Sequence, residues 1–182
     1  MRGALSSLLV LALAAGCDNA KRQPPVAPHA TLADSADQIM FGVRFNLTNN
    51  GSARAIVLAD TAFFFQDNTR VELEHVNTTF FTSTGAKNAV LTGHHGTYHT
   101  QTGTMIARGN VVVTSEDGRQ LRSQELKYDQ IHNEISSDSA FVLTEPERRL
   151  EGVGFRSDPT LKNIHVLKVV SGTSGTVTIP NQ

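Results

Sequence analysis

The sequence predicts an all-β domain, either a β-jelly-roll or a coiled stack of antiparallel hairpins. Residues 39–47 alternate apolar and polar side chains with a period of two, which is typical of a half-buried strand. No proline interrupts the chain between Phe45 and Leu143, so long hydrogen-bonded ladders are possible there. A similar pattern of side chains also returns about every 30 residues, which favours a repeated supersecondary unit.

Composition limits the class of function. The chain has 182 residues and a formal net charge of -1, which suits one domain of ordinary size. Near-neutral charge argues against nucleic acid as the main partner, because neutralising phosphates needs an excess of basic residues. The single cysteine excludes a disulfide framework and a zinc site built from cysteines.

Residues 1–16 are predicted to be a signal peptide. An apolar run, Ala4–Ala15, follows one basic residue and is too short for a bilayer-spanning helix of about 20 residues. The run leads to Gly16 and Cys17, an ending that resembles the lipobox of bacterial lipoproteins, although Ala14 stands where a lipobox usually has Leu. We therefore expect Cys17 to carry acyl chains that anchor the protein in a membrane. The alternative is an ordinary secretory signal with an unrelated cysteine.

Residues 17–36 are expected to form a flexible tether that starts at the acylated Cys17. They contain Pro24, Pro25 and Pro28 and almost no large apolar side chain. Asp18 resembles the residue that retains enterobacterial lipoproteins in the inner membrane. The folded domain is predicted over residues 37–170, and residues 171–182 are predicted to be a flexible tail.

Strands and turns follow one another through the domain, without a convincing helix pattern from Gln38 onward. The first strand is expected at Ile39–Leu47, and a second apolar run, Ile56–Phe65, is rich in phenylalanine. Later hairpin turns are indicated by Asp117-Gly118 and Glu145-Pro146, each of which follows an apolar stretch. A stack of hairpins of this kind leaves two open sheet edges.

The repeated unit predicts that each strand bends. Its four copies begin at Leu58, Leu91, Leu121 and Leu150. The similarity lies at the first position of the unit and at the positions two, five and seven residues later. On a flat strand the first two of these positions share one face and the last two share the other. A bulge between the pairs would turn all four to one side, so we expect strands that bend across a corner, as in a jelly roll.

No motif in the sequence indicates catalysis. A Gly-x-Ser-x-Gly elbow, a phosphate-binding glycine loop and an HExxH pair are all missing, so we expect neither an enzyme nor a cofactor. His94, His95 and His99 form the one cluster that suggests a metal. Histidines four apart on a strand are about 13 Å apart, too far for one ion with bonds of about 2 Å unless a bulge intervenes. A polar strand surface is the favoured interpretation, and a weak metal or pH-sensitive contact is the alternative.

Phenylalanine and tyrosine are spread over nearly every predicted strand. The simpler interpretation assigns them to a sandwich core. The other assigns some of them to a trough that holds acyl chains through burial alone, at about 25 cal/mol per Å². The lipid-binding candidates for such a trough are Phe41, Phe45, Leu58, Phe63, Phe65, Leu91, Tyr98, Ile106, Leu121, Leu126, Tyr128, Ile135, Phe141 and Phe155.

The repeated units resemble a known family. Tandem units of the form Leu-x-Ser/Gly-x-x-Leu-x-Tyr, clearest over Leu91–Arg156, resemble the LptC family of lipopolysaccharide-export proteins. The strand Gly109–Val113 and the Asp-containing turns are similar to the OstA-like repeat domains that this family shares with LptA. A weaker likeness covers Asp37–Lys168, which is most of the chain beyond the predicted tether.

The resemblance implies an OstA-like β-jelly-roll that receives lipopolysaccharide from an inner-membrane ABC transporter and passes it to a periplasmic bridge. Strands around Ile39–Leu47 would face the periplasmic jelly-roll domain of the transporter, and the edge strand Ile164–Val170 would pair with an LptA-like bridge protein. The implied location is the periplasmic face of the inner membrane, with Cys17 as the lipid anchor. The best-known members carry an N-terminal transmembrane helix, which a lipobox replaces here.

Two other functions remain open at this point. An OstA-like envelope lipoprotein could bind lipid or polysaccharide independently of the transporter, and residence in the outer membrane would favour it. A polysaccharide-binding or polysaccharide-degrading β-protein would instead need exposed aromatic side chains beside paired carboxylates, and the sequence has no such pairing.

Overall fold

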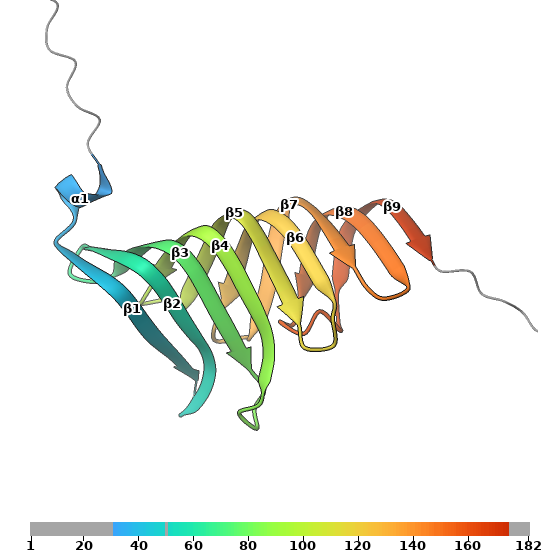
Figure 1. Ribbon diagram of the computed structural model, residues 1–182, viewed down its shortest axis with the longest axis horizontal. Coiled ribbons are helices and arrows are strands. Elements are labelled where there is room, and N and C mark those ends of the chain that lie inside the picture. The colour runs from blue at the N-terminus through green and yellow to red at the C-terminus, as the bar shows by residue number, and fades with distance from the viewer. Residues whose placement is uncertain (1–30, 50, 175–182) are drawn as a thin grey trace, which may run out of the picture. The chain divides into compact units, whose positions relative to one another are not determined.

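The computed structural model describes residues 31–49 and 51–174 of the chain. In this part of the chain a short helix, α1, precedes nine strands that form one antiparallel sheet in chain order. Each strand therefore pairs with its neighbours in the sequence, and β1 and β9 form the two edges (Figure 1). The prediction of an all-β fold is confirmed. None of the described helical residues forms a helix long and apolar enough to cross a membrane.

The strands are long. Their bounds, with that of the helix, are α1 Leu32–Ser35, β1 Gln38–Asn49, β2 Ser52–Phe65, β3 Arg70–Phe81, β4 Lys87–His99, β5 Thr104–Ser115, β6 Gln120–Asp129, β7 Glu134–Thr144, β8 Arg148–Ser157 and β9 His165–Ser174. A typical strand has about five or six residues, so each of these is long enough to cross two layers of the domain.

Each strand curves along its length, and the sheet folds over on itself (Figure 1). Residues with left-handed backbone mark several of the bends, including Gly42 in β1 with φ 60°, Asn110 in β5 with φ 48° and Gly154 in β8 with φ 74°. The register between β4 and β5 also shifts between Thr92 and His95. A bulge adds a residue to one strand and re-aims the side chains beyond it, as the repeated unit predicts.

The bends divide the sheet into two arms. Arm A contains the strand halves that meet at the turns near residues 51, 82–86, 116–119 and 145–147. Arm B contains the halves that meet at the turns near residues 66–69, 100–103 and 130–133 and at the loop 158–164. The inner faces of the arms are in contact, because the ring of Phe80 in arm A lies 4.8 Å from that of Tyr128 in arm B. The hydroxyl of Thr78 in arm A also donates to the Sδ of Met105 in arm B, at 3.8 Å.

The repeated unit points inward as expected in the later copies and is shifted in the first. In the copy that begins at Leu121, all four unit positions are buried. The first copy begins one residue earlier than predicted, because Val57 is 2% exposed and Leu58 is 43% exposed. The run Ile56–Phe65 is apolar almost throughout, so its composition does not specify which alternate residues face inward. A slip of one residue exchanges the two faces of a strand.

The domain boundaries differ slightly from the predicted ones. Strand β9 continues to Ser174, so residues 171–174 belong to the sheet and not to a tail. The Ser, Gly and Thr composition of residues 171–174 favours a flexible tail, but backbone pairing such as that of Arg148 with Ser174 needs no apolar side chain. Helix α1 lies within the predicted tether. The predicted signal peptide, Cys17 and residues 175–182 lie outside the described residues.

Candidate functional site

The inner faces of the two arms form a continuous apolar interior. Seven of the predicted lipid-binding residues lie there and are at most 3% exposed: Leu91, Leu121, Leu126, Tyr128, Ile135, Phe141 and Phe155. Strand pairing aligns them into rows, as when Leu91 in β4 pairs with Val113 and Val113 pairs with Leu121. The row continues through Leu143 to Leu150 in β8, so the apolar surface runs along the sheet from strand to strand.

Two further predicted residues lie at the margin of this interior. Phe45 and Tyr98 are partly buried and pack against the core. The hydroxyl of Tyr98 donates to Oε1 of Gln130, at 3.2 Å, and burial raises the pKa of Tyr98 above its usual value. The Nε2 of Gln130 in turn donates to the carbonyl oxygen of Thr48 at 2.6 Å, which links the turn of arm B to the end of β1 in arm A.

Four predicted residues face outward and do not line the interior. Phe41 is 78% exposed and Leu58 is 43% exposed. Phe63 and Ile106 are half-buried on the outer face, where their pairing partners are the charged residues Glu72 and Lys127. The phenylalanine-rich run and the pair Met105-Ile106 each offer two adjacent apolar residues, and only the register decides which one points inward.

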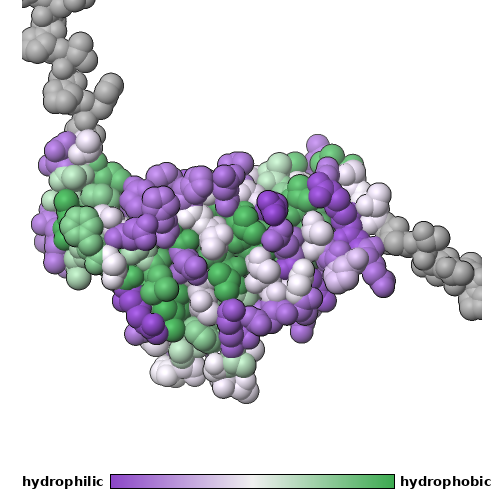
Figure 2. Space-filling model, in the orientation of Figure 1, coloured by the Kyte–Doolittle hydropathy of each residue, from purple (hydrophilic) through white to green (hydrophobic). Residues whose placement is uncertain are grey.

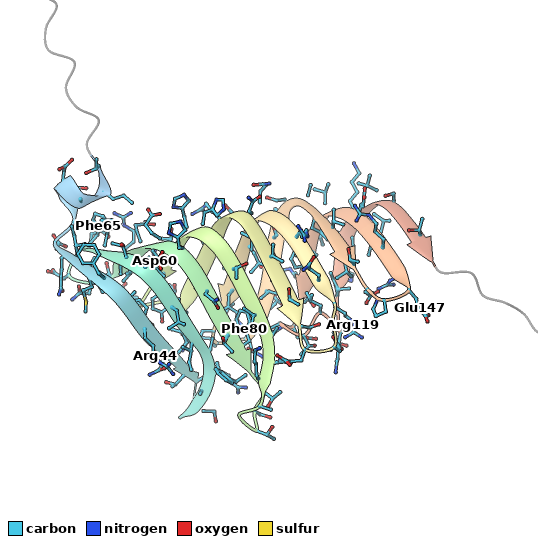
Figure 3. The ribbon with its side chains drawn as sticks, viewed as in Figure 1. Arg44, Asp60, Phe65, Phe80, Arg119 and Glu147 are labelled. Carbon is cyan, nitrogen blue, oxygen red and sulfur yellow. The ribbon has the colours of Figure 1, made fainter. Side chains whose placement is uncertain are left out.

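Phe65 is buried, but it lies outside the core cluster. Its ring packs under the guanidinium of Arg70, whose carbon Cζ is 4.3 Å from the ring centroid. Figure 3 shows Phe65 beside α1, at the end of the domain. The contact of a cation with an aromatic face is favourable and holds the ring in this place. Phe65 therefore covers the end of the sheet near β1 and does not line a trough.

Several interior residues were missed by the sequence interpretation. Met105, Val113, Leu143 and Leu161 are buried in the core cluster. Val113 and Leu143 carry a signal that could have identified them, because each stands opposite Leu121 once the hairpins are paired. Leu161 carries no such signal, since it lies in a loop without periodicity.

Most charged side chains lie outside the interior, although the Nε of Arg54 is buried without a hydrogen-bond partner among the described residues. The outer face of arm B carries polar contacts, including the ion pair of Arg108 with Glu125 at 2.7 Å and the contact of His95 Nδ1 with Oε2 of Glu74 at 2.9 Å. Within the interior, burial raises the pKa of Tyr128 to about 12, and its hydroxyl donates to Oδ1 of Asn133 at 3.1 Å. Among the described residues no group of three or more His, Cys, Asp and Glu could hold a metal ion. The interior therefore offers apolar burial and no reactive group.

A groove near the bends of β5 to β8 reaches the interior from outside. Its volume is about 660 Å³, and Phe141 of the inner face lines it together with Val112, Val142 and Val153. Val170 of β9 also lines the groove, so it lies beside the C-terminal edge of the sheet. Elsewhere the packed arms leave the inner residues almost without solvent exposure, so the interior is closed along most of its length.

Both edges of the sheet expose large apolar side chains. On β1 these are Ile39, Met40 and Phe41, which are 37%, 44% and 78% exposed. On β9 they are Leu167, Val169 and Val170, which are 58%, 59% and 63% exposed. Figure 2 shows hydrophobic surface at the β1 end of the domain. An edge strand offers unpaired backbone groups to another sheet, and apolar side chains add affinity to that pairing.

Comparison with known proteins identifies the family. The family model described as "Lipopolysaccharide-assembly, LptC-related" matches residues 7–174, most of the chain. The chain belongs to the LptC family. No curated protein sequence matches it.

Membership of the LptC family assigns the chain a role in lipopolysaccharide transport. Proteins of this family are transport components of the periplasm, associated with the inner membrane, and their partners are lipopolysaccharide and the transport machinery.

Proposed function

We propose that the chain holds the acyl chains of lipopolysaccharide between arms A and B and passes them from the inner-membrane transporter to the periplasmic bridge. The observation that carries this proposal is the row of inner residues that runs from Phe45 and Val57 through Leu91, Val113 and onward to β8. A path of that kind connects one open edge of the sheet with the other.

The energetics suit a protein that must release its cargo. Each buried methylene of an acyl chain gains about 0.8 kcal/mol relative to water. The inner side chains already pack against one another, as Phe80 and Tyr128 do. Separating the arms therefore costs contacts that the acyl chain then replaces. The net free energy of binding is therefore small compared with the free energy gained by burying the acyl chain. The lipid can then move on to the next partner.

The two edges supply the partners in this proposal. Strand β1, with exposed Phe41, joins the periplasmic jelly-roll domain of the transporter, and strand β9, with exposed Val169, joins an LptA-like bridge protein. Edge-to-edge pairing would align the interiors of successive jelly rolls into one path. The groove beside Val170 lies where such a path leaves the domain.

The membrane anchor is the acylated Cys17, which lies outside the described residues. Acyl chains on this residue would hold the domain at the periplasmic face of the inner membrane. Replacing Cys17 by Ala should move the protein from the inner-membrane fraction to the soluble periplasmic fraction. Wild-type protein in the outer-membrane fraction would instead favour an envelope lipoprotein that works independently of the transporter.

A matched pair of photo-crosslinking probes tests the binding site. Leu126 faces the interior and is 0% exposed, whereas Ile106 on the neighbouring strand faces outward. With purified full-length protein and lipopolysaccharide, a probe at Leu126 should give a lipid adduct and a probe at Ile106 should give little. Equal adduct yields from both positions, with both variants folded, would show that the lipid does not lie between the arms.

A further inference from the structure

The loop between β8 and β9, residues 158–164, places a leucine in the interior. This loop is called the strap below. It leaves arm B after Ser157, and its Leu161 is 1% exposed and belongs to the core cluster. The next two residues, Lys162 and Asn163, are exposed, so Leu161 enters the interior from a surface loop.

One carboxylate shapes the strap. Asp158 accepts hydrogen bonds from the backbone N–H and the hydroxyl of Thr160, and from the backbone N–H and the side-chain amide of Asn163. The carbonyl oxygen of Asp158 also accepts the N–H of Leu161 at 3.0 Å. Burial raises the pKa of Asp158, but the hydrogen bonds from Thr160 and Asn163 outweigh it and hold the pKa below its usual value. The ionised carboxylate thus fixes the turn that presents Leu161.

The strap begins and ends in arm B, and its middle contacts arm A. The Nζ of Lys162 lies 4.0 Å from Oδ2 of Asp117, in the β5–β6 turn of arm A. A small cavity of about 80 Å³ lies at this contact, lined by Thr160 and Lys162 of the strap and by residues of arm A such as Asn88 and Glu116. Figure 1 shows the β8–β9 connection running toward the β5–β6 turn. The strap therefore joins the two arms on the side opposite the bends.

Two features raise the free energy of the closed strap. The backbone of Leu161 has φ 59°, a left-handed conformation that side chains other than glycine adopt with strain. The hydroxyl of Ser157, immediately before the strap, is buried without a hydrogen-bond partner among the described residues. The contact with arm A adds little, because Lys162 and Asp117 are both more than a third exposed. Burial of Leu161 is the main force that keeps the strap in place.

We propose that the strap is a releasable closure of the space between arms A and B. Its release withdraws Leu161 and frees arm A from arm B near the C-terminal edge, where an acyl chain must pass. The part of this inference that concerns lipid rests on the proposed function. The closure itself is a property of the fold and can be tested without lipid.

Oxidation of methionine by dilute peroxide measures the closure without lipid. Met105 is the reporter residue, because it lies in the interior at 1% exposure and in the same row of arm B as Ser157. Met40 on β1 is 44% exposed and serves as an internal reference. In the full-length protein, Leu161→Ala should raise the oxidation rate of Met105 severalfold relative to Met40, whereas Leu161→Met should leave the ratio near wild type. Leu47→Ala, a core truncation in β1 away from the strap, controls for general loss of stability and should change the ratio little.

A milder variant and the lipid complete the test. Lys162→Glu places a carboxylate against Asp117 and Glu116 without altering the core, and it should raise the Met105 ratio less than Leu161→Ala does. With lipopolysaccharide, both loosening variants should form the Leu126 photo-adduct faster than wild type. An unchanged Met105 ratio in Leu161→Ala would overturn the closure, as would a larger rise in Lys162→Glu than in Leu161→Ala. Raised ratios with no lipid adduct in any variant, wild type included, would support the closure and contradict the proposed lipid-binding function.

Discussion

At the scale of single residues, the interior is shaped by glycines that let backbones approach. Gly152 in β8 is the clearest case, because a Cβ added there would lie 2.8 Å from the carbonyl oxygen of Lys168 and 2.8 Å from Cε1 of Phe141. Neither neighbour can move freely, since one is backbone and the other is a buried ring. The glycine thus allows Phe141 and β9 to pack against β8.

Gly152→Ala should destabilise the domain by about 1–3 kcal/mol, the usual cost of overpacking a filled site. Gly172→Ala is the matched control, because a Cβ at Gly172 would meet its nearest neighbour at 3.5 Å, an ordinary contact. Urea unfolding measures both. A loss no larger for Gly152→Ala than for Gly172→Ala would contradict the close approach of β8 to β9.

Tyr128 makes the stability of the domain depend on pH in the alkaline range. Burial raises its pKa to about 12, whereas the unfolded side chain titrates near pH 10. Between these values the unfolded state binds fewer protons, so the free energy of unfolding falls as pH rises, by on the order of 2 kcal/mol. Tyr128→Phe should weaken this fall in a series of urea titrations from pH 9 to 11.5. A variant with the same slope as wild type would show that the tyrosine is not buried as described.

The sequence predicts which residues lie in strands better than it predicts which face of the sheet each side chain occupies. Leu121 and Leu126 could be predicted because polar residues flank each of them, so only one residue at each place can face inward. Leu58 and Phe63 were assigned inward wrongly, because apolar neighbours on both sides hide the register. Leu161 could not be found from periodicity, since a loop has none.

At the scale of elements, bends inside the strands create the two arms. In β5 the bend uses Gly109 with φ 75° and Asn110 with φ 48°. Asparagine tolerates the left-handed conformation, and β-branched residues do not. The repeat indicated the bend through its change of phase, but the sequence could not specify which residue would form the bulge, because several small or polar residues lie between the two apolar pairs.

Replacing Asn110 by Val should lower the free energy of unfolding by about 1–2 kcal/mol, because valine resists the left-handed backbone. Asn110→Gly should be close to wild type, since glycine adopts this conformation freely. Thermal unfolding followed by circular dichroism compares the two. Equal melting temperatures for both variants would argue against the bend at this position.

A substitution on the edge strand β9 can test partner binding without unfolding the domain. Val169 is 59% exposed, so Val169→Lys should change stability by no more than about 0.5 kcal/mol. Lysine on an edge opposes strand addition, so the same variant should lose most of its crosslinking to an LptA-like bridge protein. Val43→Lys, at a buried position of β1, is the contrasting case and should unfold the domain. Full crosslinking by folded Val169→Lys would remove β9 from the proposed partner contact.

At the scale of the whole molecule, hairpins in chain order place the two edges at opposite ends of one apolar interior. The repeat and the lack of proline in the sequence predicted this arrangement. Both features extend over many residues, so a single misassigned position does not change the prediction. It could not show that the arms are closed, because closure depends on contacts between distant parts of the chain, such as Phe80 with Tyr128 and Lys162 with Asp117. In the proposed function, the arms must therefore open to admit an acyl chain.

Photo-crosslinking in living cells tests this central claim most directly. Probes at Leu126 and Phe141 face the interior, and a probe at Ile106 faces outward. The account predicts lipopolysaccharide adducts at the two inner positions that disappear when the ATP supply is removed, with little adduct at Ile106. Folded, exported protein that gives no adduct at either inner position, or adducts that persist equally without ATP, would contradict a path between the arms.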